Sequence, residues 1–391
     1  MRVLPKRCLL LLLVAVAAFS YTKHEVTFTY EDESAGTVNL VGTMNGWNRT
    51  ATPFTKKNGK FEVTVELHPG EYEYKFLIDG KKWITDPSNE LICHGRYDNS
   101  LLIVGSEEEI EEVKGEIRER ARLVTKIDRL KTGKTPFRFA ALGDNRGNAK
   151  IYRTLLDKIS TFKPDFAVNT GDLITNSGHL YQWEEFIDWS SGYDFPILPV
   201  VGNHDVDNAR SEKMYRDIFS LPGEEVYYSF TYGNSQFIVL DSEIPGEIGS
   251  ITGEQLEWLR QTLMNSSPAH RFVFFHRPMY ADSLIGRHFG SCLDRYPQER
   301  DTLLALLKRY NVDIVFVGHE HLFRKSIYDG VMQIITGGAG APLYAEEKNG
   351  GFYHFILVDA EGKKIEGTLY KLKDENFTAF PIFSLPAEAE E

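Results

Sequence analysis

Short apolar runs that end abruptly in glycine or polar residues recur through the second part of this 391-residue chain. Five of them cover residues 137–142, 166–168, 195–201, 272–275 and 314–317. Runs of this length between breakers are typical of strands that are buried on both faces. Segments with helical spacing of apolar residues lie between or after them, at 149–162, 181–189, 213–219, 254–264 and 298–310. This alternation predicts an α/β layered domain over residues 136–373.

The pattern differs over residues 24–105, where short segments alternate polar and apolar positions. Such segments cover 26–30, 37–41, 61–67, 72–78 and 101–104, and turn residues separate them. Regularly punctuated short strands predict an all-β, immunoglobulin-like sandwich. Asp79-Gly80, between two of these segments, predicts a tight hairpin.

The segment 106–135 between the two parts predicts a helical linker. Its apolar residues recur three or four positions apart, the spacing of one face of an amphipathic helix, at Ile110, Val113, Ile117, Ala121, Val124 and Ile127. We expect this helix to act as a spacer along one domain. The last segment, 374–391, has no periodicity and is predicted to be a frayed tail.

The first twenty residues have the layout of a secretory signal peptide. Arg2, Lys6 and Arg7 precede an apolar run over 9–18, and small residues follow. The layout predicts cleavage after Ser20 and a secreted or periplasmic protein. An uncleaved membrane anchor is the alternative, but the run is shorter than the roughly 20 residues of a spanning helix. No later segment is apolar enough to span a bilayer, so no stable span is expected after cleavage.

Composition changes this picture in two ways. The net charge of −12 argues against a general nucleic-acid-binding surface, so no nucleic-acid partner is expected. Signal cleavage would leave two cysteines, Cys93 and Cys292, in different predicted domains. An exported protein can form a disulfide between such residues, but two separate thiols are the expected arrangement.

Polar residues follow the apolar runs at the points where the predicted strands end. They are Asp144, Asp172, Asn203, His204, His276, His319 and His321. Open α/β sheets place binding sites at the carboxyl ends of their strands, so we expect these side chains to share one crevice. Carboxylates, a carboxamide and imidazoles together suit manganese, iron or zinc.

The order Gly-Asp, Gly-Asp, Gly-Asn-His-Asp, His and Gly-His-Glu-His, from Gly143 to His321, resembles the calcineurin-like metallophosphoesterases, which include the purple acid phosphatases. The resemblance implies a β-sandwich flanked by helices, a phosphate monoester or diester as substrate, and two divalent or mixed-valence metal ions. It implies that Asp172 bridges the two ions and that Asp144 and His321 bind the first. The second ion would be held by Asn203, His276 and His319.

The same resemblance implies that His204, paired with Asp205, acts on the oxygen of the leaving group or stabilises charge in the transition state. Further candidates for substrate contact are Arg277, Arg287 and His288; the alternative for Arg277, which precedes a proline, is a local ion pair. His179, by contrast, is expected in a loop or at the start of a helix.

Two positions depart from the family pattern. The family places a histidine two residues after the first aspartate, or a tyrosine three residues after the bridging one, but this chain has Arg146 and Thr175 there. A guanidinium cannot bind a metal, so Arg146 would either bind substrate phosphate or form a salt bridge to a structural carboxylate. Asn145 would be a weak oxygen ligand. We therefore predict a weakly held first metal ion.

The sandwich segment resembles the glycogen-binding module of AMP-activated kinase β subunits. The resemblance rests on residues 41–47 and 70–80, on Trp83, and on the pairs Asp86-Pro87 and Asn99-Ser100. It implies that Trp47 and Trp83 stack on glucose rings of an α-glucan, while Lys75 and Asn99 hydrogen-bond its hydroxyl groups. The alternative is that both tryptophans are packing residues and that the module binds no sugar.

Together these patterns predict an exported, metal-dependent phosphoesterase that its N-terminal module directs to glycans. A phosphorylated glucan or another sugar phosphate is the substrate class that this pairing of domains suggests. The alternative is a carbohydrate-binding surface protein whose hydrolase site is weak or inactive because of Arg146.

Overall fold

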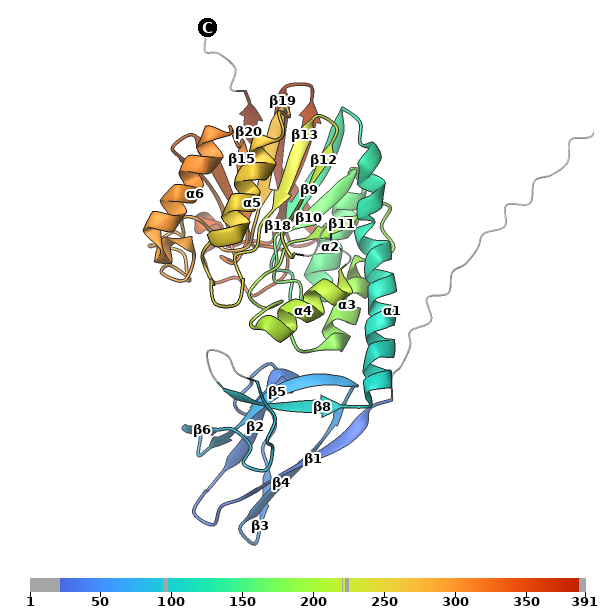
Figure 1. The fold of residues 1–391 in the computed structure, drawn as a ribbon, viewed down its shortest axis with the longest axis vertical. Helices are drawn as coiled ribbons and strands as arrows, with labels where there is room; N and C mark the ends of the chain where they lie inside the picture. Colours follow the sequence, from blue (N-terminus) through green and yellow to red (C-terminus); the bar gives the residue numbers. More distant parts are fainter. Residues whose placement is uncertain (1–21, 94–97, 220, 222–224, 387–391) are drawn as a thin grey trace, which may run out of the picture.

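The fold is taken from a computed structural model, which describes residues 22–93, 98–219, 221 and 225–386. The predicted signal segment, 1–20, lies outside these residues. Within the described part of the chain, no helix is both long and apolar enough to cross a bilayer. Figure 1 shows an all-β unit at the N-terminal end and a larger unit of strands and helices above it, with one long helix running from the first along the second.

The N-terminal unit consists of two packed antiparallel sheets. One has the order β1 (His24–Glu31), β4 (Lys60–Leu67), β3 (Thr55–Lys57). The other has the order β2 (Val38–Gly42), β5 (Gly70–Ile78), β8 (Asn99–Val104), β7 (Ile92–Cys93), with β6 (Lys82–Ile84) paired to β5 and the short helix η1 (Thr43–Asn45) after β2. Phe28, Leu40, Phe61 and Phe76 pack between the sheets. The predicted sandwich and its Asp79-Gly80 hairpin are confirmed, since Leu77 of β5 lies opposite Trp83 of β6.

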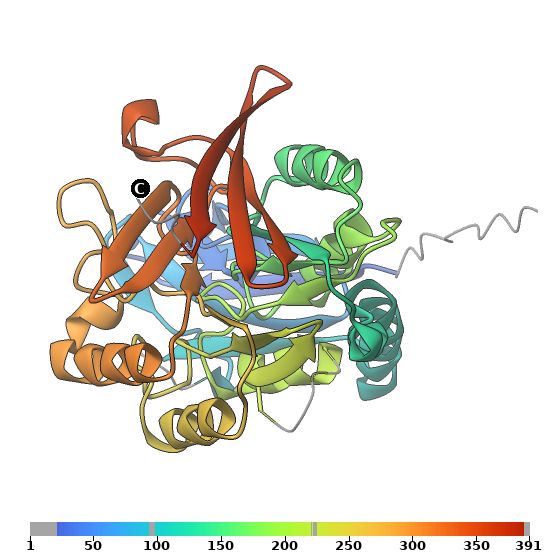
Figure 2. The ribbon, with the colours of Figure 1, turned by 90° about the horizontal axis from the view of Figure 1, so that it is seen from above.

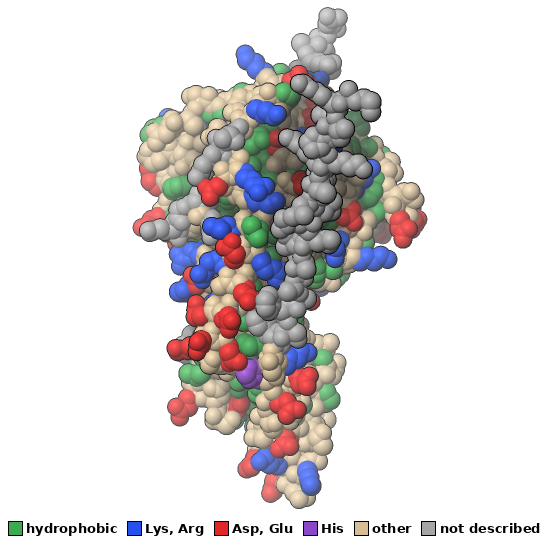
Figure 3. Space-filling view, turned by 90° about the vertical axis from the view of Figure 1, so that its right-hand side faces the viewer, with side chains coloured by type: hydrophobic (Ala, Val, Ile, Leu, Met, Phe, Trp, Pro, Cys, Tyr) green, Lys and Arg blue, Asp and Glu red, His purple; other side chains and the backbone are tan. Residues whose placement is uncertain are grey.

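The predicted amphipathic helix is present as α1 (Glu107–Thr125), and η2 (Ile127–Thr132) follows it. Ser106 and Glu109 form a capping box at its first turn, which satisfies two backbone N–H groups. Its apolar face packs against α3 and α4 through Ile110, Val113, Ile117, Ala121 and Val124. Figure 3 shows acidic and basic side chains along the side that faces away from the core. Packing of one apolar face therefore holds this linker along the larger unit.

The larger unit is built from two six-stranded sheets that pack face to face (Figure 2). The first has the order β11 (Ile197–Pro199), β10 (Phe166–Asn169), β9 (Phe137–Leu142), β18 (His354–Glu361), β19 (Lys364–Lys373), β20 (Asn376–Leu385). The second has the order β12 (Tyr228–Tyr232), β13 (Ser235–Val239), β14 (His270–Phe274), β15 (Ile314–Val317), β17 (Val331–Thr336), β16 (Phe323–Tyr328). Phenylalanines such as Phe139, Phe237 and Phe272 fill the space between the sheets.

Helices cover both outer faces. The first sheet packs against α1, α2 (Ala149–Ser160), α3 (Leu180–Ser190) and α4 (Ala209–Ile218). The second sheet packs against α5 (Gly253–Met264) and α6 (Pro297–Arg309), and the short helices η3 (Leu293–Arg295) and η4 (Glu347–Asn349) lie in loops. The predicted β-sandwich flanked by helices is thereby confirmed. Cys93 and Cys292 are both free thiols, as expected.

The predicted frayed tail over 374–391 is wrong for residues 376–385. They form β20, which pairs antiparallel with β19 from Asn376 to Leu385. Phe377 packs on the face of the first sheet that the helices cover, and Phe383 packs on the face that meets the second sheet. Pro381 is tolerated because β20 is an edge strand, where a missing N–H need not interrupt the ladder.

Candidate metal centre

Five strands deliver their polar residues to one end of the two sheets. β9, β10 and β11 are parallel neighbours, so Asp144, Asp172 and Asn203 leave the same edge of the first sheet. β14 and β15 are parallel neighbours in the second sheet, and His276 and His319 follow them. The sequence-based expectation of one shared crevice therefore rests on parallel pairing, which aligns the carboxyl ends of the strands.

The turns after these strands are backbone-constrained. Asp144, Asp172 and His319 adopt left-handed backbone conformations, with φ of 59°, 55° and 67°. Such conformations are uncommon for residues other than glycine and occur often at functional sites. Glycine is required next to them, because a Cβ at Gly202 would lie 2.2 Å from the backbone nitrogen of Asp172. A Cβ at Gly318 would lie 2.5 Å from Oδ2 of Asp144.

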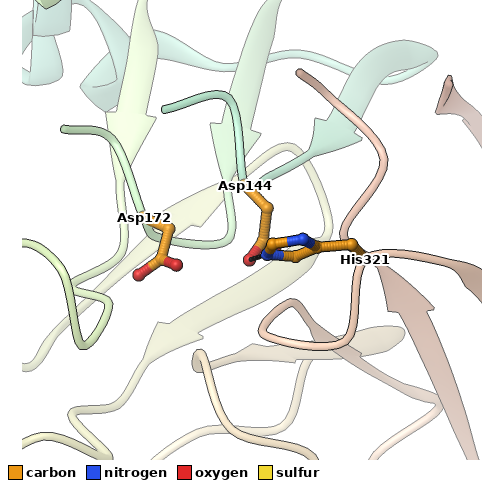
Figure 4. A group of neighbouring side chains, drawn as sticks. All are labelled: Asp144, Asp172 and His321. Atoms are coloured by element: carbon orange, nitrogen blue, oxygen red, sulfur yellow. Dashed lines mark ion pairs between the residues drawn. The ribbon is translucent and has the colours of Figure 1, made fainter. Parts of the chain in front are cut away.

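A first group of donor atoms consists of Asp144, Asp172 and His321, whose potential ligand atoms all lie within 4.8 Å of one another. Figure 4 shows the three side chains close to one another, on the segments that follow β9, β10 and β15. Nε2 of His321 lies 3.6 Å from Oδ1 of Asp144, and its Nδ1 lies 2.8 Å from the carbonyl oxygen of Pro342. Donation from Nδ1 to that carbonyl leaves the Nε2 lone pair free to bind a metal.

A second group shares Asp172 with the first. Nε2 of His276 lies 3.3 Å from Oδ1 of Asp172, 3.1 Å from Oδ1 of Asn203 and 3.1 Å from Nδ1 of His319. Ligand atoms around a four-coordinate ion with bonds of about 2.1 Å are roughly 3.4 Å apart. The spacing therefore fits one ion. Nδ1 of His276 is held 2.9 Å from the carbonyl oxygen of Thr170, which turns Nε2 toward this group.

The electrostatics of the two groups favour a cation. Burial and the like charge of Asp172 raise the pKa of Asp144 well above its ordinary value. Burial alone would raise the pKa of Asp172, but the imidazoles beside it and the Arg146 guanidinium hold it below its ordinary value. Burial lowers the pKa of His276 and of His321 to about 4, so both rings are neutral near pH 7 and keep a lone pair. Two buried carboxylates with neutral imidazoles fit a pair of divalent ions.

Three of the four predicted sugar-binding residues, Lys75, Trp83 and Asn99, lie on one face of the N-terminal sandwich, and the fourth, Trp47, lies in the turn after η1. Lys75 lies on β5 two residues before Leu77, which is opposite Trp83, so Lys75 and Trp83 share a face. Asn99 lies on β8 and donates from Nδ2 to Oε2 of Glu73 on the same strand β5, at 2.8 Å. Trp83 is 39% exposed, and the guanidinium of Arg49 lies 5.7 Å from the centre of its ring.

Comparison with known families decides the class of this arrangement. Residues 137–323 match the family model described as calcineurin-like phosphoesterase. The chain contains a calcineurin-like phosphoesterase domain. Residues 24–106 match the model for the glycogen recognition site of AMP-activated protein kinase. Both resemblances noted in the sequence are confirmed.

Curated relatives match one part or the other. The serine/threonine-protein phosphatase CPPED1 of Rattus norvegicus is 26% identical over 224 residues, which cover 54% of this chain and 69% of that protein. Purple acid phosphatase 21 of Arabidopsis thaliana is 28% identical over 231 residues, 53% of this chain and 51% of that protein. Protein PTST homolog 2 of the same plant is 39% identical over 71 residues, 18% of this chain and 13% of that protein. The chain thus spans about half of the purple acid phosphatase and a small part of the PTST homolog.

Solved structures show the same fold. A purple acid phosphatase from yellow lupin, PPD1, superposes with a TM-score of 0.54 at 16% identity and covers 92% of this chain and 69% of its own. PhoD superposes with a TM-score of 0.50 at 13% identity and covers 93% of this chain and 88% of its own. At these identities the likeness concerns the fold of the phosphoesterase domain and its attached β-unit, and it says nothing more of the activity.

Arg146 occupies the place where the family has a metal-binding histidine, and it pairs with the shared carboxylate. Its Nε lies 3.3 Å from Oδ2 of Asp172, and its side chain is largely buried. The predicted oxygen ligand, Asn145, is wrong. Its Oδ1 accepts a 2.7 Å hydrogen bond from Asn169, and its Nδ2 donates to the carbonyl oxygen of Leu173. The first group of the phosphoesterase domain thus gains a fixed positive charge in place of a fourth ligand.

His204 lies beside the centre, but its predicted pairing with Asp205 is wrong. Its Nδ1 lies 2.8 Å from the carbonyl oxygen of Thr175, and its Nε2 lies 4.0 Å from Oδ2 of Asp172. The carboxylate of Asp205 points away and accepts three backbone hydrogen bonds instead, from Gly202, Leu173 and Ile174. Asp205 therefore joins the turn that carries Asn203 to the turn that carries Asp172, and it holds no imidazole.

Arg277 forms an internal ion pair, which was the alternative to its prediction as a substrate contact. Its Nε lies 2.8 Å and 2.9 Å from the two carboxylate oxygens of the buried Glu243, and its Nη1 donates to the carbonyl oxygen of Ser291 at 2.7 Å. Nη1 also lies 3.3 Å from Nε2 of His319. The guanidinium is thus bonded to buried groups of the protein, and it holds the ring of His319 at Nε2. Sequence reasoning missed Glu243, which lies in a loop with no periodic signal.

His288, one of the predicted substrate contacts, reaches the mouth of the centre. Its ring lies 4.3 Å from the ring of His319, and its side chain is 30% exposed. The buried Glu320 holds this loop by accepting the backbone N–H groups of Arg287 and His288, each at 2.8 Å. Tyr344 also donates to Glu320. The position of Glu320 inside Gly-His-Glu-His was the sequence signal for this support, and Tyr344 had none.

His179 begins α3, as expected, but it faces the N-terminal sandwich. Its ring packs edge-on against Tyr72 with centroids 4.9 Å apart, and its Nδ1 lies 3.0 Å from Nε2 of Gln182. Its own Nε2 is buried, with no hydrogen-bond partner among the described residues. Burial lowers the pKa of His179 to about 3.

This burial predicts a loss of stability in acid. Between pH 6.5 and about 3 the unfolded chain binds a proton at His179 that the folded chain does not, so the free energy of unfolding falls as pH drops below 6.5. At about pH 5 this residue alone costs roughly 2 kcal/mol. Urea unfolding at about pH 7.5 and about pH 5 should show a smaller loss for His179→Phe than for the wild type. Equal losses for the two proteins would contradict the assignment.

Proposed function

We propose that the chain is a metal-dependent hydrolase of phosphate monoesters or diesters, exported by its N-terminal signal segment to the cell exterior or periplasm. The observation that carries the proposal is the position of Asp172, whose carboxylate oxygens face both donor groups. Asp144 and His321 would hold one ion of manganese, iron or zinc, and Asn203, His276 and His319 would hold the other. The match to the calcineurin-like phosphoesterase model supports the same reaction class.

The surrounding residues support in-line attack on a phosphate ester. When bound, a pair of such ions supplies Lewis acidity to the phosphoryl oxygens and to the attacking water. In its protonated form, His204 would donate the Nε2 proton to the leaving oxygen, while its Nδ1–H stays bonded to the carbonyl oxygen of Thr175. Arg146, beside Asp172, and His288, beside His319, would bind the remaining phosphoryl oxygens.

The N-terminal module supports an α-glucan as the part of the substrate that directs binding. Its match to a glycogen recognition model and its exposed indole, Trp83, suit the apolar face of a glucose ring. Lys75 and Asn99 lie beside it and would bind hydroxyl groups. A phosphorylated glucan combines both chemistries in one molecule.

Turnover of para-nitrophenyl phosphate and of its bis-ester, with manganese added, tests the reaction class. We expect hydrolysis of at least one of the two and loss of about 100-fold or more in Asn203→Ala, which removes a ligand of the second ion. Retention of the protein on insoluble glucan tests the module, and Trp47→Ala and Trp83→Ala should each weaken it. Retention that neither substitution changes would exclude sugar recognition at this face.

A second function is favoured by one observation. Arg146 places a fixed positive charge against Asp172, where a first metal ion would bind. A protein that holds glucan but turns over neither ester with any divalent metal would be a carbohydrate-binding protein with an inactive hydrolase site.

A further inference from the structure

Two segments of the phosphoesterase domain contact the N-terminal sandwich, and each directly follows residues of the candidate metal centre. One is the loop after Asp172, residues 173–181, and the other is the turn after Asn203 and His204, residues 205–211. α3 and α4, which these segments enter, lie at the end of the phosphoesterase domain that faces the sandwich (Figure 1). The sandwich therefore contacts segments that continue directly along the chain from Asp172 and His204.

Polar contacts fix one strand of the sandwich against these segments. Glu71 of β5 forms an ion pair with Arg210 in the first turn of α4. Glu73 lies two residues after Glu71, on the same face of β5. Its Oε1 accepts a 2.9 Å hydrogen bond from Nδ2 of Asn208. Asn208 is the N-cap of α4, and its side-chain oxygen also accepts from the backbone of Arg210. The orientation of β5 is thus coupled to the start of α4.

Ring packing holds the neighbouring part of the interface. Tyr72 packs edge-on against His179, and His68 lies 5.7 Å from Tyr181, centroid to centroid. The chains also approach closely, since a Cβ at Gly178 would lie 3.1 Å from the carbonyl oxygen of Glu71. Charged and aromatic contacts together argue for a defined orientation of the two domains, in contrast to a flexible tether.

The sugar-binding face continues from these same contacts. Glu73 accepts Asn208 on one carboxylate oxygen and the predicted sugar contact Asn99 on the other. In the turn after η1, a Cβ at Gly46, the residue before Trp47, would lie 4.0 Å from Nδ2 of Asn176. Asn176 follows Thr175, the residue whose carbonyl oxygen holds His204. Glu73 therefore links the predicted sugar contact Asn99 to the start of α4. The turn that carries Gly46 lies beside Asn176, in the segment whose Thr175 holds His204.

We infer that the sandwich face and the metal centre form one composite substrate site, which binds a single phosphorylated α-glucan chain across both domains. Glucose units stack on the sandwich while a phosphate ester of the same chain enters the centre. The Glu71–Arg210 pair is a positioning contact that aligns the two halves and does not touch the reacting atoms. This inference rests on the proposed phosphoesterase function and adds the route by which the glucan reaches the centre.

The test compares charge reversal with charge exchange at this pair, in the full chain loaded with manganese. Arg210→Glu places two carboxylates together, whereas Glu71→Arg combined with Arg210→Glu restores the pair. We expect Arg210→Glu to lower kcat/KM for a phosphorylated malto-oligosaccharide at least about tenfold more than kcat/KM for para-nitrophenyl phosphate, because the second point of attachment is lost. The exchanged pair should recover most of this loss.

Asn208→Asp is a second variant, which keeps an N-cap for α4 but places a carboxylate against Glu73. It should give the same selective loss. Lys57→Glu, at the exposed β3 far from the interface, is the matched control and should leave the ratio of the two activities unchanged. Equal losses on both substrates, no loss, or no recovery in the exchanged pair would overturn the inference while the esterase function stands. Absence of turnover on either ester in the wild type would overturn the proposed function, and this inference with it.

Discussion

Asp172→Asn should lower kcat for para-nitrophenyl phosphate about 10³-fold or more at saturating manganese, the largest effect expected of any single substitution here. Asp172 lies within reach of both donor groups, at 3.3 Å from Nε2 of His276 and within 4.8 Å of the ligand atoms of Asp144 and His321. Asparagine keeps the size of the side chain and can still accept the 3.0 Å hydrogen bond from the backbone of His204. It removes the charge that two neighbouring cations require.

The measurement is kcat together with the metal content of the purified protein, and both should fall. Asp241→Asn is the matched control. Burial raises the pKa of Asp241 well above its ordinary value, so the carboxamide replaces a carboxyl group whose ionisation burial disfavours. Asp241 serves the loop of Glu243 by accepting its backbone N–H. Wild-type activity and metal content in Asp172→Asn would show that the bridging assignment is mistaken.

Arg146→His should raise the affinity of the first metal position by about 10- to 100-fold. In the wild type the guanidinium lies 3.3 Å from Asp172 and repels a divalent ion at that carboxylate. Histidine removes the permanent charge and offers an imidazole nitrogen at the position where the family has one. We therefore expect the wild type to retain fewer than two ions after dialysis, and the variant to retain one more.

Arg146→Lys is the matched control, because it keeps the positive charge and adds no metal ligand. Lysine keeps a positive charge near Asp172, and its ammonium group offers no lone pair, so the variant should hold metal no better than the wild type. Metal content after dialysis and titration with manganese would measure all three proteins. Two tightly retained ions in the wild type would contradict the role assigned to Arg146.

Local pattern was sufficient for most of the fold. The apolar runs, their glycine breakers and the helical spacing between them predicted the layered α/β unit, its flanking helices and the all-β module before it. Those signals are local, because a strand or helix is read from the spacing of its own side chains. β20 was missed for the same reason, since only its pairing with β19 and the packing of Phe377 and Phe383 make it a strand.

For the candidate site, too, the sequence predicted which residues take part but not what their side chains contact. The pattern of the sequence placed its six predicted metal ligands at the ends of buried strands, and the resemblance to the metallophosphoesterases implied their role. The sequence could not show that Asp205 holds two turns together, that Asn145 is already bonded to Asn169, or that Arg146 meets Asp172.

The sequence by itself determined which strands exist and which residues stand at their ends. Only the tertiary structure decided what those side chains touch, and that β5 of the sandwich is joined to the start of α4 through Glu71 and Glu73. The physical reason is that strand period and turn chemistry act over a few neighbouring residues. Contacts such as Glu73 with Asn208 join residues far apart in the chain, and they arise only when two separately encoded units pack together.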